Sequence, residues 1–228
     1  MEIQANRSNP FIQKHNTLLV TEIFHSLQGE SSYAGLPCVF IRLTGCNLRC
    51  HYCDTQYSFY GGQKLTFKDL VLKIACYKTR LVEITGGEPL LQKGTPHFCE
   101  LLLHKHYTVL VETSGAEDIS VLDPEIIKIM DLKCPSSGEC HRNRFENFRY
   151  LTSKDEVKFV IGSRQDYEWA KSMISEKMGH LEVKILFSAV FNQLNDEILA
   201  DWILDDQLSV RMQIQLHKRI WSPNRRGV

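Results

Sequence analysis

Short apolar runs rich in β-branched residues alternate with longer segments of helical period, and this alternation constrains the fold more than any other feature. The runs predicted as strands are residues 37–43, 81–85, 107–112, 126–132, 156–161, 182–187 and 210–216, with an additional strand at about 18–24. The segments predicted as amphipathic helices are residues 66–77, 164–178 and 195–204. Because parallel neighbours need a crossover that is usually helical, the alternation predicts a parallel sheet.

Polar and glycine-rich residues follow the predicted strands where each one ends. These strand ends are Thr44-Gly45-Cys46, Gly86-Gly87-Glu88, Thr113-Ser114-Gly115, Lys133-Cys134-Pro135 and His217-Lys218. In a (β/α) barrel, closed or partial, that rim forms the active site. An open doubly wound sheet binds ligands only where its strand order reverses. Having so many marked strand ends favours the barrel-like form.

The composition is that of a single globular domain without an electrostatic bias. The chain has 228 residues, with Lys plus Arg and Asp plus Glu both at 27 and a net charge of zero. This balance gives no general attraction to nucleic acid or to an anionic membrane. The apolar runs are shorter than the about 20 residues that cross a bilayer, and residues 1–10 have no signal-peptide centre. We therefore expect one domain over residues 1–228, located in the cytoplasm, with no membrane or nucleic-acid partner.

The cysteines are unevenly distributed. Of the eight, Cys46, Cys50 and Cys53 are grouped, whereas the others are scattered at positions 38, 76, 99, 134 and 140. In a chain of this length without a signal peptide, they are better interpreted as thiols or metal ligands than as a disulfide scaffold. Residues 38, 76 and 99 are expected to be small core residues, as free cysteine often is.

The grouped cysteines form a Cys-x-x-x-Cys-x-x-Cys pattern in a loop after a predicted strand. A structural zinc site closes a tetrahedron with four ligands, and no second Cys/His pair stands at finger spacing. His51 lies between two of the cysteines, where reaching the same ion is awkward. Three cysteines on a four-iron cluster instead leave one iron open to a further ligand. The pattern favours an iron–sulfur cluster over zinc or ordinary buried thiols.

The run from Phe40 to Asp54, FIRLTGCNLRCHYCD, resembles the signature of radical S-adenosylmethionine (SAM) enzymes, and Thr85-Gly86-Gly87-Glu88-Pro89 resembles the loop that contacts the methionine amino group in that superfamily. The resemblance implies a [4Fe–4S] cluster on the three cysteines. It also implies SAM, chelated at the open iron and cleaved to a 5′-deoxyadenosyl radical that abstracts hydrogen. The implied fold is α/β, a partial (β/α)6-type TIM-like barrel.

Other segments narrow the family. Residues 24–30 (FHSLQGE), Asp54-Thr55, residues 111–115 (VETSG) and residues 215–218 (QLHK) together closely resemble the 7-carboxy-7-deazaguanine synthase family, and the resemblance runs from about residue 21 to 223. It implies a carbon–nitrogen lyase of queuosine and 7-deazapurine biosynthesis. This reaction converts 6-carboxy-5,6,7,8-tetrahydropterin to 7-carboxy-7-deazaguanine with loss of ammonia.

The resemblance also assigns site residues. Those expected to bind the cofactor are Tyr52, Cys53, Asp54, Gly87, Glu88, Gly115, Asp131, Lys133 and Ser136. Those expected to bind the substrate are Leu27, Gln28, Gly29, Glu30, Arg42, Thr113, His217 and Pro223. The chemistry fits, because an amide and a carboxylate can pair with the donors and the carbonyl of a pterin edge, and a guanidinium suits a carboxylate. From the residues alone, Gln28 and Glu30 would equally suit a solvated turn, and Arg42 a surface ion pair.

Further expectations follow from the family. Thr55 is expected to help hold Mg²⁺, which prefers oxygen ligands, although on sequence alone it would merely cap a turn. A homodimer and a flavodoxin or ferredoxin-type electron donor are also implied. The chain departs from the family at Ser31 and Ser32, where glycine is common, and in residues 224–228 after Pro223. The alternatives are a glycyl-radical-enzyme activase with the same cluster chemistry and a zinc-stabilised binding module.

Overall fold

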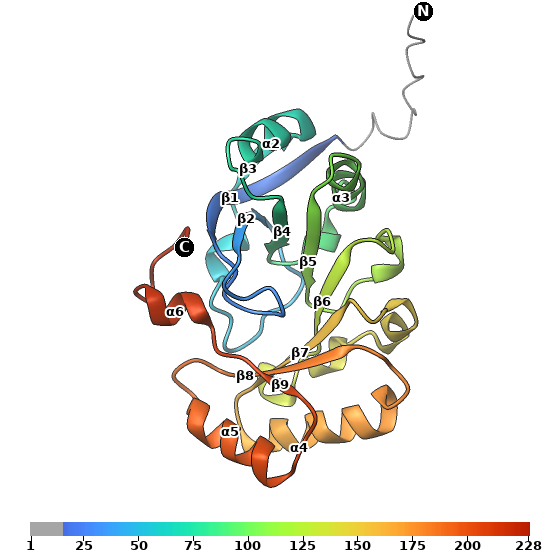
Figure 1. The fold of residues 1–228 in the computed structure, drawn as a ribbon, viewed down its shortest axis with the longest axis vertical. Coiled ribbons are helices and arrows are strands. Elements are labelled where there is room, and N and C mark those ends of the chain that lie inside the picture. The colour runs from blue at the N-terminus through green and yellow to red at the C-terminus, as the bar shows by residue number, and fades with distance from the viewer. Residues whose placement is uncertain (1–15) are drawn as a thin grey trace, which may run out of the picture.

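The computed structural model describes residues 16–228, so the predicted polar segment 1–10 lies outside the described residues. These residues form one nine-stranded sheet of order β3-β1-β2-β4-β5-β6-β7-β8-β9 (Figure 1). The strands are β1 (Thr17–Leu27), β2 (Pro37–Leu43), β3 (Gln63–Thr66), β4 (Leu81–Gly86), β5 (Thr108–Thr113), β6 (Ile127–Asp131), β7 (Glu156–Ile161), β8 (Lys184–Ala189) and β9 (Arg211–Met212). β1 is antiparallel to β2 and β3, and every pairing from β2 through β9 is parallel.

α-Helices lie in four of the connections between parallel strands, whereas those from β5 to β6 and from β6 to β7 contain only 3-10 turns. The α-helices are α2 (Phe67–Ile74), α3 (Thr95–His104), α4 (Arg164–Met173), α5 (Asp196–Asp205) and α6 (Leu216–Ile220), with a π-helical turn at Ile174–Met178. Short 3-10 turns lie at Gln56–Ser58, Pro89–Leu91, Ile119–Val121, Pro135–Ser137, Cys140–Arg142 and Phe145–Tyr150. The partial, TIM-like α/β barrel is confirmed, and in the part of the chain that the structure describes the sheet does not close, because β3 and β9 remain its two edges.

Local signals in the sequence set the helix starts. Thr66 caps α2 by accepting from the backbone N–H of Asp69 at 3.1 Å, and the Asp69 carboxylate accepts from the N–H of Thr66 at 3.2 Å, which completes a capping box. Ser163 and Asn195 also cap α4 and α5, since their side chains accept from the backbone N–H of Asp166 and Glu197 without a reciprocal bond. These helix starts agree with the predicted segments.

The sheet has apolar residues on both faces, which differ in what covers them. On the outer face, one core cluster packs β2, β4 and β5 against α2 and α3, and a second packs β6 to β8 against α4 and α5. Figure 1 shows the two helix pairs beside these two halves of the sheet. The inner face carries a smaller apolar cluster that includes Phe40, Leu110 and Ile129. The remainder of the inner face is polar, and it forms the candidate site.

Three predictions need correction. The strand predicted at 210–216 keeps only Arg211–Met212, because the following chain turns toward residues 28–30: Leu216 donates its N–H to the carbonyl of Gly29 at 2.9 Å and begins α6. The helix predicted to run to residue 178 is α-helical only to Met173. Cys76 is exposed and not a core residue, whereas Cys38 and Cys99 are buried.

None of the helices among residues 16–228 is long and apolar enough to cross a bilayer.

Candidate active site

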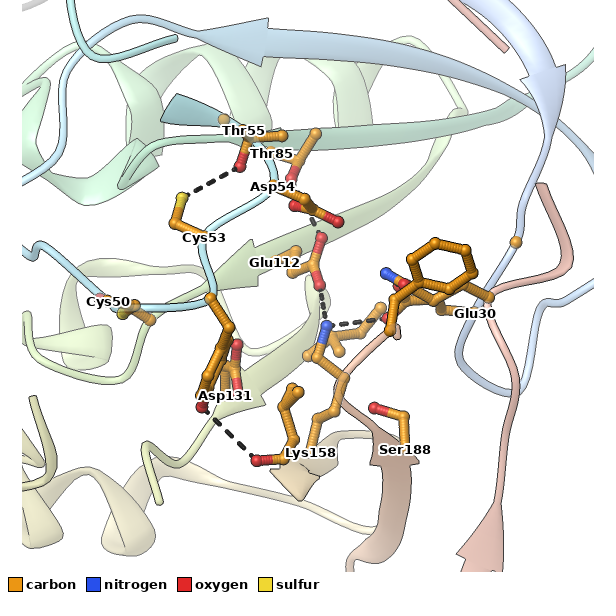
Figure 2. Close-up of a pocket in the computed structure, with 18 of the residues that line it drawn as sticks. Glu30, Cys50, Cys53, Asp54, Thr55, Thr85, Glu112, Asp131, Lys158 and Ser188 are labelled. Atoms are coloured by element: carbon orange, nitrogen blue, oxygen red, sulfur yellow. Dashed lines mark hydrogen bonds and ion pairs between the residues drawn. The ribbon is translucent and has the colours of Figure 1, made fainter. Parts of the chain in front are cut away.

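A cavity of about 580 Å³ opens on the inner face of the sheet. Its wall combines the loop that carries the grouped cysteines, the carboxyl-terminal ends of the parallel strands, residues 27–31 and the start of α6. Figure 2 shows Cys50, Cys53 and Thr55 on one side of this cavity and Glu30 on the other, with Glu112, Asp131 and Lys158 reaching in from β5, β6 and β7. The strand ends that the sequence marked as polar therefore meet in one place.

Cys46, Cys50 and Cys53 all line the cavity, and all eight cysteines are free thiols. Burial raises the pKa of Cys50 to about 11 and also raises that of Cys46, so iron would displace protons on binding. Among residues 16–228, no three His, Cys, Asp or Glu side chains converge tightly enough to hold a single ion. A four-iron cluster takes each thiolate on a different iron, so three separated thiols on one cavity wall fit a cluster better than one zinc ion.

The Gly-Gly-Glu loop packs directly against the cysteine loop. Gly87 also lines the cavity, and a Cβ at this position would stand 2.7 Å from the Cβ of Cys46 and closer still to the carbonyl oxygen of Gly45. The N–H of Glu88 donates to that same carbonyl at 2.8 Å. Only glycine permits this approach, and it fixes the backbone of the first cluster cysteine against the end of β4.

Glu88 itself is outside the cavity lining. Its fully buried carboxylate accepts from the backbone N–H of Ser114 at 2.7 Å, from the Thr113 hydroxyl at 2.9 Å and from the N–H of Leu90 at 2.9 Å. Burial raises the pKa of Glu88, and these donors act in the opposite direction. The side chain therefore joins the ends of β4 and β5, and the structure does not bring it to the cavity wall.

A polar network forms the inner wall of the cavity. The Lys158 ammonium contacts Glu30 at 2.8 Å and also Glu112, which accepts from the Thr85 hydroxyl at 3.0 Å. Glu30 accepts in addition from the Gln215 amide at 2.8 Å.

A third carboxyl group, that of Glu83, is buried beside this network and accepts from the Gln28 amide. Burial, together with the charges of Glu112 and Glu30, raises the pKa of Glu83 well above its ordinary value. The protonated form of Glu83 is therefore retained to a higher pH than that of an ordinary carboxyl group.

Ion pairs also involve residues of the cavity lining. Arg42 donates through Nε to Glu22 at 2.8 Å, so it forms an ion pair, but a largely buried one, and Arg42 also lines the cavity. Lys218 pairs with Asp54 at 2.7 Å; burial tends to raise the pKa of Asp54, but this ammonium outweighs it and the pKa is lowered. Burial lowers the pKa of His217, so its imidazole is neutral near pH 7.

A polar pair stands near Tyr52 and Cys50. Lys133 pairs with Asp131 Oδ2 at 2.6 Å, and the other carboxylate oxygen, Asp131 Oδ1, is buried without a hydrogen-bond partner among the described residues. Because a buried acceptor without a partner costs stability, this atom indicates a polar ligand that donates to it. The Thr55 hydroxyl lies 3.8 Å from the sulfur of Cys53, also facing the cavity.

Most of the predicted site residues are brought together. Those that line the cavity are Leu27, Gln28, Gly29, Glu30, Arg42, Cys46, Cys50, Tyr52, Cys53, Asp54, Thr55, Gly87, Thr113, Asp131, Lys133 and His217. Glu88, Gly115, Ser136 and Pro223 are outside its lining.

The other three residues outside the lining make contacts elsewhere. Ser136 donates its N–H to Asp166 at 2.9 Å. The carbonyl of Gly115 accepts from the Asn147 amide at 3.1 Å. Pro223 lines a neighbouring cavity, and Val228 reaches the main one in its place.

The sequence reasoning missed Glu83, Glu112 and Lys158. The sequence nevertheless indicates them, because strands buried on both faces of a parallel sheet usually consist of continuous apolar residues. Charged residues at alternate positions of such a strand, as in Leu81-Val82-Glu83 or Lys158-Phe159-Val160, indicate that one face lines a polar cavity.

Comparisons with known proteins agree with this site. Residues 40–132 match the model of the radical SAM superfamily. The chain is 44% identical to the 7-carboxy-7-deazaguanine synthase of Koribacter versatilis over 224 residues, which cover 92% of this chain and 99% of that protein. It is also 44% identical to the enzyme of the same name from Chlorobaculum tepidum, covering 92% and 97%.

Solved structures support the fold. The chain is similar to QueE from Escherichia coli with a TM-score of 0.78 and 21% identity, over 93% of this chain and all of that one. It is more distantly similar to Streptococcus suis SuiB bound to S-adenosylmethionine, with a TM-score of 0.52 and 14% identity, over 94% of this chain and 55% of that one. From the level and extent of the sequence identity, the chain belongs to the 7-carboxy-7-deazaguanine synthase family of radical SAM enzymes.

Proposed function

We propose that this chain is a radical SAM carbon–nitrogen lyase that converts 6-carboxy-5,6,7,8-tetrahydropterin to 7-carboxy-7-deazaguanine with loss of ammonia, a step of queuosine and 7-deazapurine biosynthesis. The observation that carries this proposal is the 44% identity to synthases of that product over nearly their whole length. The same relatives disfavour the glycyl-radical activase and the zinc-stabilised module. We treat residues 1–228 as one catalytic domain.

Membership of the superfamily implies a [4Fe–4S] cluster and SAM. When bound, these two groups supply a radical that abstracts hydrogen from the substrate. We assign Cys46, Cys50 and Cys53 as the cluster ligands, because all three thiols stand on one wall of the cavity. Asp131 is assigned to the cofactor, because its buried unpaired oxygen can accept from a donor there.

The remaining cofactor residues divide into two groups. Tyr52, Asp54, Gly87 and Lys133 line the cavity and are assigned to direct contact. Glu88, Gly115 and Ser136 are assigned a supporting role, in which they fix the loops that carry the first group.

For the substrate, we assign the residues of the opposite wall. Glu30 and Gln28 would meet the N–H and carbonyl groups of the pterin edge, and Arg42 the substrate carboxylate. Leu27, Gly29, Thr113 and His217 complete this surface, and a neutral His217 can both donate and accept a hydrogen bond. Pro223 would act only through the chain segment that it precedes.

Three further assignments follow from the family. We propose that Thr55 offers its hydroxyl to a Mg²⁺ that also meets the substrate carboxylate, because it faces the cavity beside Cys53. We also propose a homodimer and a flavodoxin or ferredoxin-type protein as electron donor. Each is open to a direct test by Mg²⁺ titration, by sedimentation and by turnover with purified donors.

The function is tested by a product assay. Protein reconstituted anaerobically with iron and sulfide is reduced, mixed with SAM and 6-carboxytetrahydropterin, and analysed by mass spectrometry for the deazapurine. We expect product from the native chain and none from Cys50→Ala, with Cys76→Ala as the matched control that keeps full activity because Cys76 is exposed and remote from the cavity. Loaded native protein that forms no deazapurine would refute the function.

A further inference from the structure

A buried lysine on β7 joins two carboxylates from distant parts of the chain. The ammonium of Lys158 contacts Glu30, which follows β1, at 2.8 Å and contacts Glu112 of β5. The Lys158 side chain is 7% exposed, whereas those of Glu30 and Glu112 are 17% and 28% exposed. All three side chains line the cavity, and the ammonium stands between the two carboxylates, which are more exposed than it is (Figure 2).

Charge and burial make this a fixed arrangement. Burial tends to lower the pKa of Lys158, but Glu112 and Glu30 outweigh it, so the pKa lies well above its ordinary value and the ammonium stays charged. Burial tends to raise the pKa of Glu112, but Lys158 lowers it, so this group stays a carboxylate. Each carboxylate oxygen has two acceptor sites. Thr85, Lys158, Gln213 and Gln215 use some of these sites and leave others free to accept from a ligand.

The fold alone does not require this network. Apolar side chains of suitable volume stabilise a core as well as a buried ion pair does, or better. Lower on the same inner face, Leu110 and Ile129 fill the equivalent positions of β5 and β6. On β7 the inner face keeps one further carboxylate below Lys158, that of Glu156, which is outside the cavity lining and accepts from the N–H of Ser32 at 3.1 Å. Glu112 and Lys158, in contrast, line the cavity, which points to recognition of a ligand.

We propose that Lys158 is a positioning residue that holds Glu30 and Glu112 as paired acceptors for the N–H edge of a pterin-type heterocycle, with Glu112 in direct contact with it. This inference rests on the proposed function and deepens it, because it adds Glu112 to the substrate contacts and gives Lys158 a role through its two partners. The geometry suits a flat ligand whose neighbouring N–H groups meet two anions held at a set separation.

Binding of a non-reactive pterin tests the inference. Oxidised, cluster-loaded protein is titrated with 6-carboxypterin by calorimetry, which needs no turnover. We expect Lys158→Met to weaken binding about tenfold or more, because two carboxylates left without their ammonium separate or take up a proton. Lys154→Met is the matched control, since Lys154 pairs with the exposed Glu125 and lies outside the cavity lining; its binding should equal that of the native chain.

A double-mutant cycle separates positioning from independent contact. The cycle uses the single variants Lys158→Met and Glu30→Gln and the double variant that carries both changes. The double variant should weaken binding by less than the product of the two single effects, because the lysine acts through Glu30. Effects that multiply fully would overturn the positioning role, as would native affinity in Lys158→Met. If Lys158→Met does not accumulate, Lys158→Gln and Glu112→Gln replace it, and native affinity in both would overturn the inference.

The product assay keeps the two proposals apart. Native protein that binds 6-carboxypterin but yields no deazapurine contradicts the proposed function alone. If the native protein turns over and Lys158→Met is as active and binds 6-carboxypterin as tightly as the native chain, only the role of Lys158 is contradicted.

Discussion

Replacing Gly87 by alanine is expected to displace the cysteine loop and to lower cluster loading. The added Cβ would stand 2.7 Å from the Cβ of Cys46 and nearer to the carbonyl oxygen of Gly45, and neither the backbone atom nor the short side chain can rotate away. Overpacking of this kind typically costs about 1–3 kcal/mol. For a chain of 228 residues this corresponds to a melting temperature lower by about 2–12 °C.

Two measurements check this expectation. Iron bound per chain after anaerobic reconstitution should fall in Gly87→Ala, and the melting temperature of the cluster-free protein should fall with it. Gly179→Ala is the matched control, because the nearest atom to its added Cβ is 3.7 Å away and its φ of −58° suits any residue. Native iron content together with a native melting temperature in Gly87→Ala would refute the reasoning.

Three other perturbations test separate parts of the structure. Lys128→Met should lower the free energy of unfolding by about 3–5 kcal/mol in urea titrations. The reason is that the fully buried carboxylate of Asp155, 3.2 Å from the ammonium, loses its counter-charge; a loss below about 1 kcal/mol would contradict this. Glu83→Gln should gain stability over the native chain as pH rises. The raised pKa of Glu83 means that its protonated form stabilises the fold below about pH 4.3, and this contribution is lost as pH rises through the folded-state value, at about 1.4 kcal/mol per unit; a stability difference constant with pH argues against a raised pKa of Glu83. Thr55→Ala should weaken the response of turnover to Mg²⁺, and an unchanged titration would leave Thr55 a structural role only.

The fold was largely predictable because its signals are local. Buried parallel strands such as residues 156–161 appear as apolar runs, and a capping residue such as Thr66 marks a helix start within four residues. The element at 210–216 was predicted wrongly, because contacts with residues 28–30 override its strand propensity. β3 and α3 were missed, since β3 is only four residues long and the start of α3 follows a turn without a capping side chain.

The site residues also differ in whether local sequence identifies them. Residues in contiguous motifs, such as Cys46 or Gln28, could be placed from the sequence, since their neighbours identify them. Glu83, Glu112 and Lys158 come from three strands, and their contacts depend on the register of the assembled sheet. The motif also does not reveal which way Glu88 points, because that depends on donors offered by Thr113 and Ser114.

The central claim is that three thiolates on one wall of the cavity hold a four-iron cluster with one iron open to SAM. Electron paramagnetic resonance of the reduced, reconstituted protein, recorded with and without SAM, tests it directly. We expect the signal of a reduced four-iron cluster whose g values shift when SAM is added. A reduced cluster whose spectrum is unchanged by saturating SAM, or protein that binds tight zinc and never forms a cluster, would contradict the account.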